Sequence, residues 1–303
     1  MSIKSRIDLY RNCYKRVIAD LKQLSLGQKS DYDLLQLAHR LEKGLLIQNP
    51  KPMWGWEKAE KMVMLLKNNN DTFSTTTAKA VLSAYLAAKS KSQYQEDRDK
   101  CADFLNKTGF QPISFDKIGG SISVEKTNFS QEELSTIEKL FNTRHSCREF
   151  SDKHVSKEDI SEAVNLALRC PSACNRQPFR VYAIEPSKLE QKLGHKLQYS
   201  GDRTLVITGD VRAFQSSEMF DWIVSPAIFA GYLTLSLHSL CIGSCVVRKD
   251  LLVDADYNKA IRAITGMSES ERIILELFIG YYKDEYISPA SNRNDANGII
   301  KYV

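Results

Sequence analysis

A seven-residue segment in the second half of the chain combines side chains that bind phosphate. Residues 144–150 read Arg-His-Ser-Cys-Arg-Glu-Phe, so two guanidinium groups, an imidazole and a hydroxyl lie within a few positions of one another. Arginine offers paired donors in a fixed fork and serine adds a neutral donor, a combination that suits a dianionic phosphate. Taken alone, the segment is explained slightly better as a solvated basic loop without a ligand, because short basic clusters are common.

A second unusual segment is Pro-Ser-Ala-Cys-Asn-Arg-Gln-Pro-Phe, at residues 171–179. Its prolines break the preceding helix and lead into a strand. Ser172, Asn175 and Gln177 place hydroxyl and amide groups in an apolar neighbourhood, and amides offer both donor and acceptor atoms. These groups could read the edge of a heteroaromatic ring, or they could form a turn that satisfies its own backbone.

Two further residues are weaker candidates. Gly243, within Cys-Ile-Gly-Ser-Cys at residues 241–245, would let backbone approach a flat ligand closely. As the C-cap of the preceding helix it would need no ligand. Arg293, within Pro-Ala-Ser-Asn-Arg at residues 289–293, is either a further anion contact or a surface charge.

The elements before these segments are expected to be helical. Apolar residues at helical spacing predict helices over residues 7–21, 34–45, 57–67, 76–89 and 94–107, with Ser30 near an N-cap and Gly109 as a stop. No alternating apolar run predicts a strand before residue 110. Residues 110–130, which contain a proline and two glycines, read as a linker or crossing segment.

Helices and short strands alternate after residue 130. Helices are predicted over residues 131–142, after a Ser156 cap, and over 186–193, 222–240 and 256–264. Strands are predicted over residues 179–184, 204–208, 244–247 and 273–279. This alternation is typical of a layered α/β or α+β domain.

Composition limits the possible classes. The 303 residues are 43% hydrophobic and 26% charged, which fits a folded globular protein, and a net charge of +5 is too small to indicate nucleic acid. The charge is uneven: 21 Lys and Arg against 14 Asp and Glu give +7 for residues 1–130, and 21 against 23 give −2 for residues 131–303. The basic first part could favour an anionic substrate or an acidic partner.

Cysteines and apolar stretches indicate the compartment. Seven cysteines, an odd number, together with a charged start that lacks a signal peptide, predict reduced thiols in the cytoplasm. Two C-x3-C pairs, beginning at Cys170 and Cys241, predict small buried thiols rather than a zinc site. Residues 222–247 lack charged side chains and could span a bilayer by length. A helix buried on all sides of a domain is the simpler prediction.

In their order along the chain, the two polar segments resemble the nitroreductase family of flavoproteins. The pattern R-H-S-x-R-x-F, a helix, P-S-x-x-N-x-Q-P-F and a strand is followed by the long apolar helix, the Gly-Ser-Cys turn and the late P-x-S-x-R. The resemblance covers about residues 131–303. It implies an α+β layered domain, with a central mixed sheet flanked by helices, preceded by a helical region and linker at residues 1–130.

The resemblance also implies a cofactor and a site. Members of the family bind FMN at a homodimer interface and pass electrons from NADH or NADPH to small oxidised molecules. By matching motifs, the phosphate and ribityl chain would be held by Arg144, His145, Ser146, Arg148 and Arg293. The flavin ring would lie against Pro171, Ser172, Ala173, Asn175 and Gln177 of the other subunit, and against the backbone of Gly243 and Ser244. Family members often have a further basic contact, for which Lys196 and Arg203 are candidates.

The leading hypothesis is therefore a homodimeric, cytoplasmic, FMN-dependent NAD(P)H oxidoreductase that reduces a nitroaromatic, a quinone or a similar acceptor by a ping-pong mechanism. No residue is singled out for proton transfer, no metal site is expected, and the chain has no G-x-G-x-x-G loop for a separate nicotinamide domain.

Two other functions remain open. The chain could be a flavin-binding scaffold or partner protein without turnover, because it has a long basic extension. This extension is similar to those of nitroreductase-like proteins associated with polysaccharide biosynthesis. Independently of the function, the extension would supply a lid over the flavin, from His39, Glu42, Trp54 or Trp56, or only an added helical layer. A cysteine hydrolase would use Cys147 or Cys174 with His145 or His154.

Overall fold

The first part of the chain is helical, as predicted. The computed structural model describes residues 2–26, 30–70, 72–197, 200–215, 218, 220–247 and 256–303. The first helices are α1 (Ile3–Leu26), α2 (Ser30–Leu45), α3 (Trp56–Leu66), α4 (Thr72–Ser90) and α5 (Gln95–Thr108). Gly109 ends α5 in the left-handed conformation, with φ of 65°, and its amide donates to the Leu105 carbonyl. The residues just before Ser30 lie outside the described part, so the predicted cap of α2 stays a prediction.

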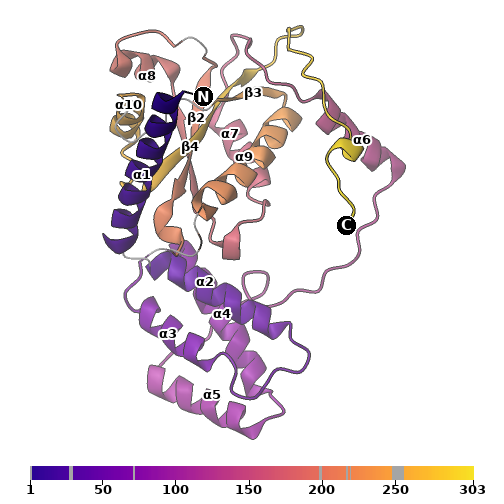
Figure 1. The fold of residues 1–303 in the computed structure, drawn as a ribbon. Helices are drawn as coiled ribbons and strands as arrows, with labels where there is room; N and C mark the ends of the chain where they lie inside the picture. Colours follow the sequence, from indigo (N-terminus) through magenta and orange to yellow (C-terminus); the bar gives the residue numbers. More distant parts are fainter. Residues whose placement is uncertain are drawn as a thin grey trace.

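Helix α2 joins the two parts of the molecule because it has two buried faces. One face places Leu34 in the core that α2 shares with α3 and α4. The opposite face places Tyr32 and Leu35 in a second cluster with Trp222. The Tyr32 hydroxyl also donates to Asp210 over 3.3 Å. The helical layer α2–α5 is therefore attached to the sheet-containing part through α2 (Figure 1).

The expected linker has no helix or strand from residue 109 to residue 130. Its first part lies against α4. The Ile113 amide donates to the Ser83 hydroxyl over 2.9 Å, and a Cβ on Gly119 would lie 2.6 Å from the Val81 amide nitrogen. Only glycine fits where the linker crosses α4 this closely.

The second part of the chain contains the sheet. Its helices are α6 (Gln131–Thr143), α7 (Lys157–Ala167), α8 (Pro186–Leu193), α9 (Asp221–Ser239) and α10 (Asp256–Thr265). Its strands are β1 (Phe179–Ile184), β2 (Arg203–Asp210), β3 (Ile242–Val247) and β4 (Glu271–Tyr281), and its short 3-10 helices are η1 (Ala173–Asn175), η2 (Val211–Ala213) and η3 (Ala296–Gly298). The Ser156 cap of α7 is confirmed, because its hydroxyl accepts from the Asp159 amide over 3.0 Å.

The sheet corrects one prediction. Its order is β1-β2-β4-β3, and every pair of neighbouring strands is antiparallel. The α+β class is confirmed, but the expected mixed sheet is wrong for the described strands. The parallel pairing found in the described chain is an isolated bridge between Ser146 and Ser244. Periodicity identifies strands but not their directions, which depend on how the connections cross.

Alternating residues of β2 serve two cores. Leu205 and Ile207 pack on one side of the sheet with Phe229 of α9, whereas Val206 packs on the other side with Leu189 of α8. This alternation follows from the two-residue period of a strand. Helices α7 and α9 cover the first side, and α8 and α10 cover the second (Figure 1).

The apolar helix α9 is not buried on all sides. Val224, Ile228 and Tyr232 are 49%, 36% and 44% exposed along one face. In the described part of the chain, no helix is long and apolar enough to cross a membrane. Helix α9 therefore has two apolar faces in different surroundings. One face packs in the core, and the other is exposed on this chain.

Candidate functional site

The arginine-rich segment is anchored to the edge of the sheet. It follows α6, and the Cys147 amide donates to the Ser244 carbonyl of β3 over 3.0 Å. The isolated bridge between Ser146 and Ser244 lies at the same place. Arg144, His145 and Ser146 are half-buried, and Arg148 is exposed. The sheet edge thus holds this loop in a fixed conformation.

Gly243 has a structural task here. It lies inside β3, not at the end of the helix, where Leu240 is the C-cap of α9. A Cβ on Gly243 would lie 2.9 Å from the Cys147 Cβ and 2.9 Å from the Tyr282 ring. Its interpretation as a helix cap is therefore wrong. The lack of a side chain lets the arginine-rich segment lie directly against β3.

The arginine-rich segment carries uncompensated positive charge. Among the described residues, no carboxylate forms an ion pair with Arg144 or Arg148, and the nearby Glu149 pairs with Lys283 over 3.6 Å. His238 lies at the end of α9, where its ring nitrogens are 2.8 Å from the Thr143 hydroxyl and 2.9 Å from the Tyr282 hydroxyl. Burial lowers the pKa of His238, and the charge of Arg144 lowers it further.

The C-terminal tail reaches this loop only in part. The Ser288 hydroxyl donates to the Ser146 carbonyl over 3.4 Å. Arg293 is exposed, and its guanidinium donates to the Ser291 carbonyl of the tail itself. A contact between Arg293 and the arginine-rich segment therefore stays a prediction.

The second polar segment has an unusual backbone. Cys174, Asn175 and Gln177 have φ values of 51°, 50° and 47°, in the left-handed region that side chains other than glycine rarely adopt. The Gln177 amide donates to the Ser172 hydroxyl over 3.2 Å. The Gln177 side chain donates to the Asn175 side-chain oxygen over 3.2 Å. These bonds agree with a turn that satisfies its own polar groups, but such strain concentrates at functional sites.

Arg176 fixes this strained segment, and sequence reasoning missed it. Its side chain is 2% exposed and donates to Glu218 over 2.9 and 2.7 Å. It also donates to the carbonyls of Ala173 and Ala213 and lies over the Phe214 ring, 4.5 Å from the centroid. No local signal could have found this residue, because Glu218 is 42 positions away in the sequence.

The two polar segments lie at opposite ends of α9 within one chain. The Ala173 amide donates to the Ser225 hydroxyl over 3.3 Å near the start of the helix, whereas Thr143 contacts His238 near its end. Thirteen residues of α-helix separate Ser225 from His238, or about 20 Å. One copy of the chain does not bring the predicted phosphate and ring residues together.

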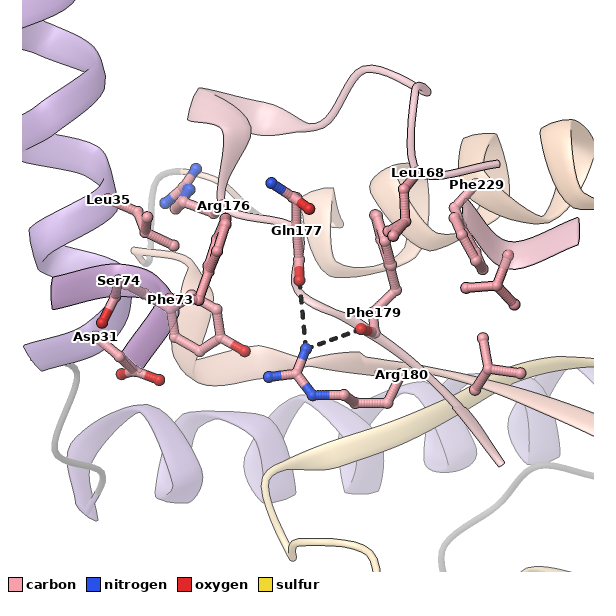
Figure 2. A pocket seen from close by; sticks show the side chains of 13 residues that line it. Asp31, Leu35, Phe73, Ser74, Leu168, Arg176, Gln177, Phe179, Arg180 and Phe229 are labelled. Atoms are coloured by element: carbon pink, nitrogen blue, oxygen red, sulfur yellow. Dashed lines mark hydrogen bonds between the residues drawn. The ribbon is translucent and has the colours of Figure 1, made fainter. Parts of the chain in front are cut away.

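A cavity of about 500 Å³ borders the strained segment. Figure 2 shows Asp31, Phe73 and Ser74 of the N-terminal helices on one side of it. Gln177 and Arg180 also line it, and they lie between those residues and Phe179 and Phe229 of the sheet-containing part (Figure 2).

The N-terminal residues proposed as a lid are mostly structural. Trp56 is 4% exposed in the helical core and donates to Asp97 over 3.2 Å, and Trp54 packs edge-on against Tyr85. Glu42 accepts a hydrogen bond from the Gly120 amide of the linker, and burial raises its pKa.

His39 differs from these lid candidates. Burial lowers its pKa, and the charges of Lys43 and Arg176 lower it further. Arg176 belongs to the strained segment, so the charge of this segment acts on the His39 imidazole.

Other predicted chemical groups have different surroundings. Cys147 is completely buried, its thiol donates to the Glu149 carbonyl, and burial raises its pKa, which is the opposite of an activated nucleophile. Lys196 pairs with Glu190 over 2.8 Å, and Arg203 lies 3.4 Å from Asp202. Within the described residues, no group of three His, Cys, Asp or Glu side chains could hold a metal.

Comparison with known proteins supports the resemblance. The model of the nitroreductase family matches residues 142–201, which include both polar segments. The resemblance to the nitroreductase family is thereby confirmed for this segment. A curated relative from Archaeoglobus fulgidus, whose name includes NADH dehydrogenase/NAD(P)H nitroreductase, is 26% identical over 153 residues, or 48% of this chain and 86% of that protein. The family match supports an oxidoreductase activity.

Solved structures of nitroreductases are also similar. A nitroreductase-like family protein from Bacillus cereus is 18% identical and covers 59% of this chain and 99% of its own, with a TM-score of 0.47. An FMN-dependent nitroreductase from Clostridium difficile is 21% identical and covers 55% of this chain and 98% of its own, with a TM-score of 0.42.

Proposed function

We propose that this chain is an FMN-dependent oxidoreductase that uses NADH or NADPH to reduce a small oxidised acceptor such as a nitroaromatic or a quinone. The observation that carries the proposal is the arginine-rich segment at the edge of β3. Arg144 and Arg148 have no carboxylate partner among the described residues, and the loop that carries them is hydrogen-bonded to β3. A dianionic phosphate would supply the missing charge.

The residues present fit the parts of FMN. Arg144, His145, Ser146 and Arg148 would hold the phosphate and ribityl chain, and Arg293 of the C-terminal tail would add a further guanidinium. The ring would lie against Pro171, Ser172, Ala173, Asn175 and Gln177, whose backbone Arg176 fixes. Gly243 and Ser244 would contact FMN through their backbone. They also let the arginine-rich segment lie against β3. FMN, when bound, accepts a hydride from the nicotinamide and passes its electrons on.

A homodimer would complete the site. The arginine-rich segment and the ring residues of one chain lie at opposite ends of α9, about 20 Å apart along the helix, so one chain does not bring them side by side. The exposed face of α9, together with Phe141 of α6 and Leu166 of α7, lines an apolar groove of about 650 Å³. A second copy that covers this groove would bring its strained segment next to the arginine-rich segment of the first copy, as a two-fold interface permits.

The chain's own residues then position the substrates. Arg144 and Arg148 would fix the phosphate end of FMN and so orient its ring toward the substrates. The nicotinamide and the acceptor would use the same open face in turn, which gives ping-pong kinetics. The proposed enzyme would act in the cytoplasm, where cysteine thiols stay reduced.

The absorbance spectrum of the purified full-length protein tests the proposal. After FMN addition and removal of the excess, we expect flavin bands that bleach on anaerobic titration with NADPH or NADH. The double variant Arg144→Gln/Arg148→Gln should retain little FMN. Retained flavin that neither nicotinamide reduces would favour a scaffold role instead, and a protein that retains no flavin would refute the proposal.

A further inference from the structure

The cavity beside the strained segment has walls that suit a flat ring. Its volume of about 500 Å³ lies within the range of small-molecule sites. Its apolar lining consists of Tyr32, Leu35, Phe73, Val164, Leu168, Phe179, Val181 and Phe229. Phe179 and Phe229 are stacked with their centroids 4.3 Å apart, and Phe73 is 50% exposed on the opposite side. Aromatic walls of this kind bury a planar molecule with little loss of side-chain freedom.

Arg180 provides the charge in this cavity. It is exposed on the edge strand β1, and one terminal nitrogen donates to the carbonyls of Gln177 and Phe179 over 3.4 and 2.8 Å (Figure 2). No carboxylate among the described residues pairs with it, and its other nitrogens have no hydrogen bond to a described residue. The backbone contacts orient the guanidinium and leave donors available for a carboxylate.

Asp31 limits the charge that a ligand can carry. It lies on the same cavity wall as Phe73, and the charge of Arg212 acts on it. Burial raises the pKa of Asp31, so its surroundings already disfavour negative charge. A ligand with one anionic group can reach Arg180, whereas a second anionic group near Asp31 would be repelled.

We propose that this cavity binds a flat aromatic monocarboxylate of one or two rings, with its carboxylate on Arg180 and its ring against Phe73 and Phe179. The N-terminal helices α2 and α4 supply one wall, and they lie outside residues 142–201, which match the nitroreductase model. These added helices would thus set the specificity. Gln177 lines the cavity and is also one of the residues proposed to lie against the flavin ring. The ligand would therefore be the electron acceptor, an assignment that rests on the proposed function.

Isothermal titration of the full-length protein with 4-nitrobenzoate, and in parallel with nitrobenzene, tests the proposal. Arg180→Gln should weaken 4-nitrobenzoate binding by about tenfold, since a hydrogen bond to a charged group is lost, and should change nitrobenzene binding by less than about twofold. Phe73→Ala should weaken both ligands. The matched controls are Arg11→Gln and Phe129→Ala, which change exposed side chains that do not line the cavity.

The same samples separate this proposal from the proposed function. Flavin content is read from the absorbance spectrum, and folding from the melting temperature of each variant. Binding that depends on Arg180 in a protein without flavin would support the cavity and refute the oxidoreductase. Reducible flavin in a protein that does not bind 4-nitrobenzoate, or that binds it equally well after Arg180→Gln, would overturn the cavity proposal and leave the oxidoreductase intact.

Discussion

The pair formed by Arg176 and Glu218 should hold the strained segment in place, and Glu218→Gln tests this. The substitution leaves the Arg176 guanidinium, 2% exposed, without its carboxylate. Breaking a buried ion pair costs about 3–5 kcal/mol. The Glu218 side chain is 23% exposed, so solvent recovers part of this energy. We therefore expect a loss of about 2–3 kcal/mol in the free energy of unfolding.

Thermal denaturation measures this loss. For a chain of this size, 1 kcal/mol corresponds to about 2–4 °C in melting temperature, so Glu218→Gln should melt about 4–12 °C lower. The left-handed residues store about 1–3 kcal/mol each, and the weakened segment should relax and bind FMN less tightly. Asp103→Asn is the control, because its pair with Lys107 is exposed and worth under about 1 kcal/mol. A Glu218→Gln protein that melts within 1 °C of the wild type, about the error of the method, would refute the reasoning.

Two further predictions concern the arginine-rich segment and the residues that pack against it. Gly243→Ala should lower the melting temperature and weaken FMN binding, because the new methyl group would lie 2.9 Å from the Cys147 Cβ; a variant as stable as the wild type would contradict this packing. For His238, burial and the charge of Arg144 lower the pKa, so the unfolded chain binds the proton more readily than the folded one. The free energy of unfolding should therefore fall as the pH falls below about 6.5, down to the lowered pKa of the folded state, and urea titrations at several pH values should show a smaller fall for His238→Gln.

The elements were largely predictable because their signals are local. The helical periodicity of α3 and α5, the Ser156 cap and the β-forming run of β1 each depend on neighbouring residues, and the structure has each within a few positions of its prediction. The arginines at 144 and 148 were also visible from the sequence, but their spacing alone slightly favoured a solvated basic loop, and their role as an anion-binding loop stays a prediction.

What the sequence could not supply are relations between distant residues. The antiparallel sheet depends on how the connections between its strands cross. The role of Gly243 depends on its contact with Cys147, which is almost a hundred positions earlier in the sequence. Sequence reasoning assigned no role to Arg176, because its partner Glu218 is 42 positions away. The open face of α9 could not be distinguished from a buried one, because both are apolar.

A heterodimer experiment tests the central claim, that two chains build each flavin site, most directly. One chain would carry Arg144→Ala and Arg148→Ala, and the other Ser172→Ala and Asn175→Ala, with different affinity tags for tandem purification. Each variant alone should bind little FMN. The purified heterodimer has one site with both halves intact, so it should bind about one FMN per two chains. A heterodimer as free of flavin as its two parents, beside a wild-type dimer that binds two, would contradict the account.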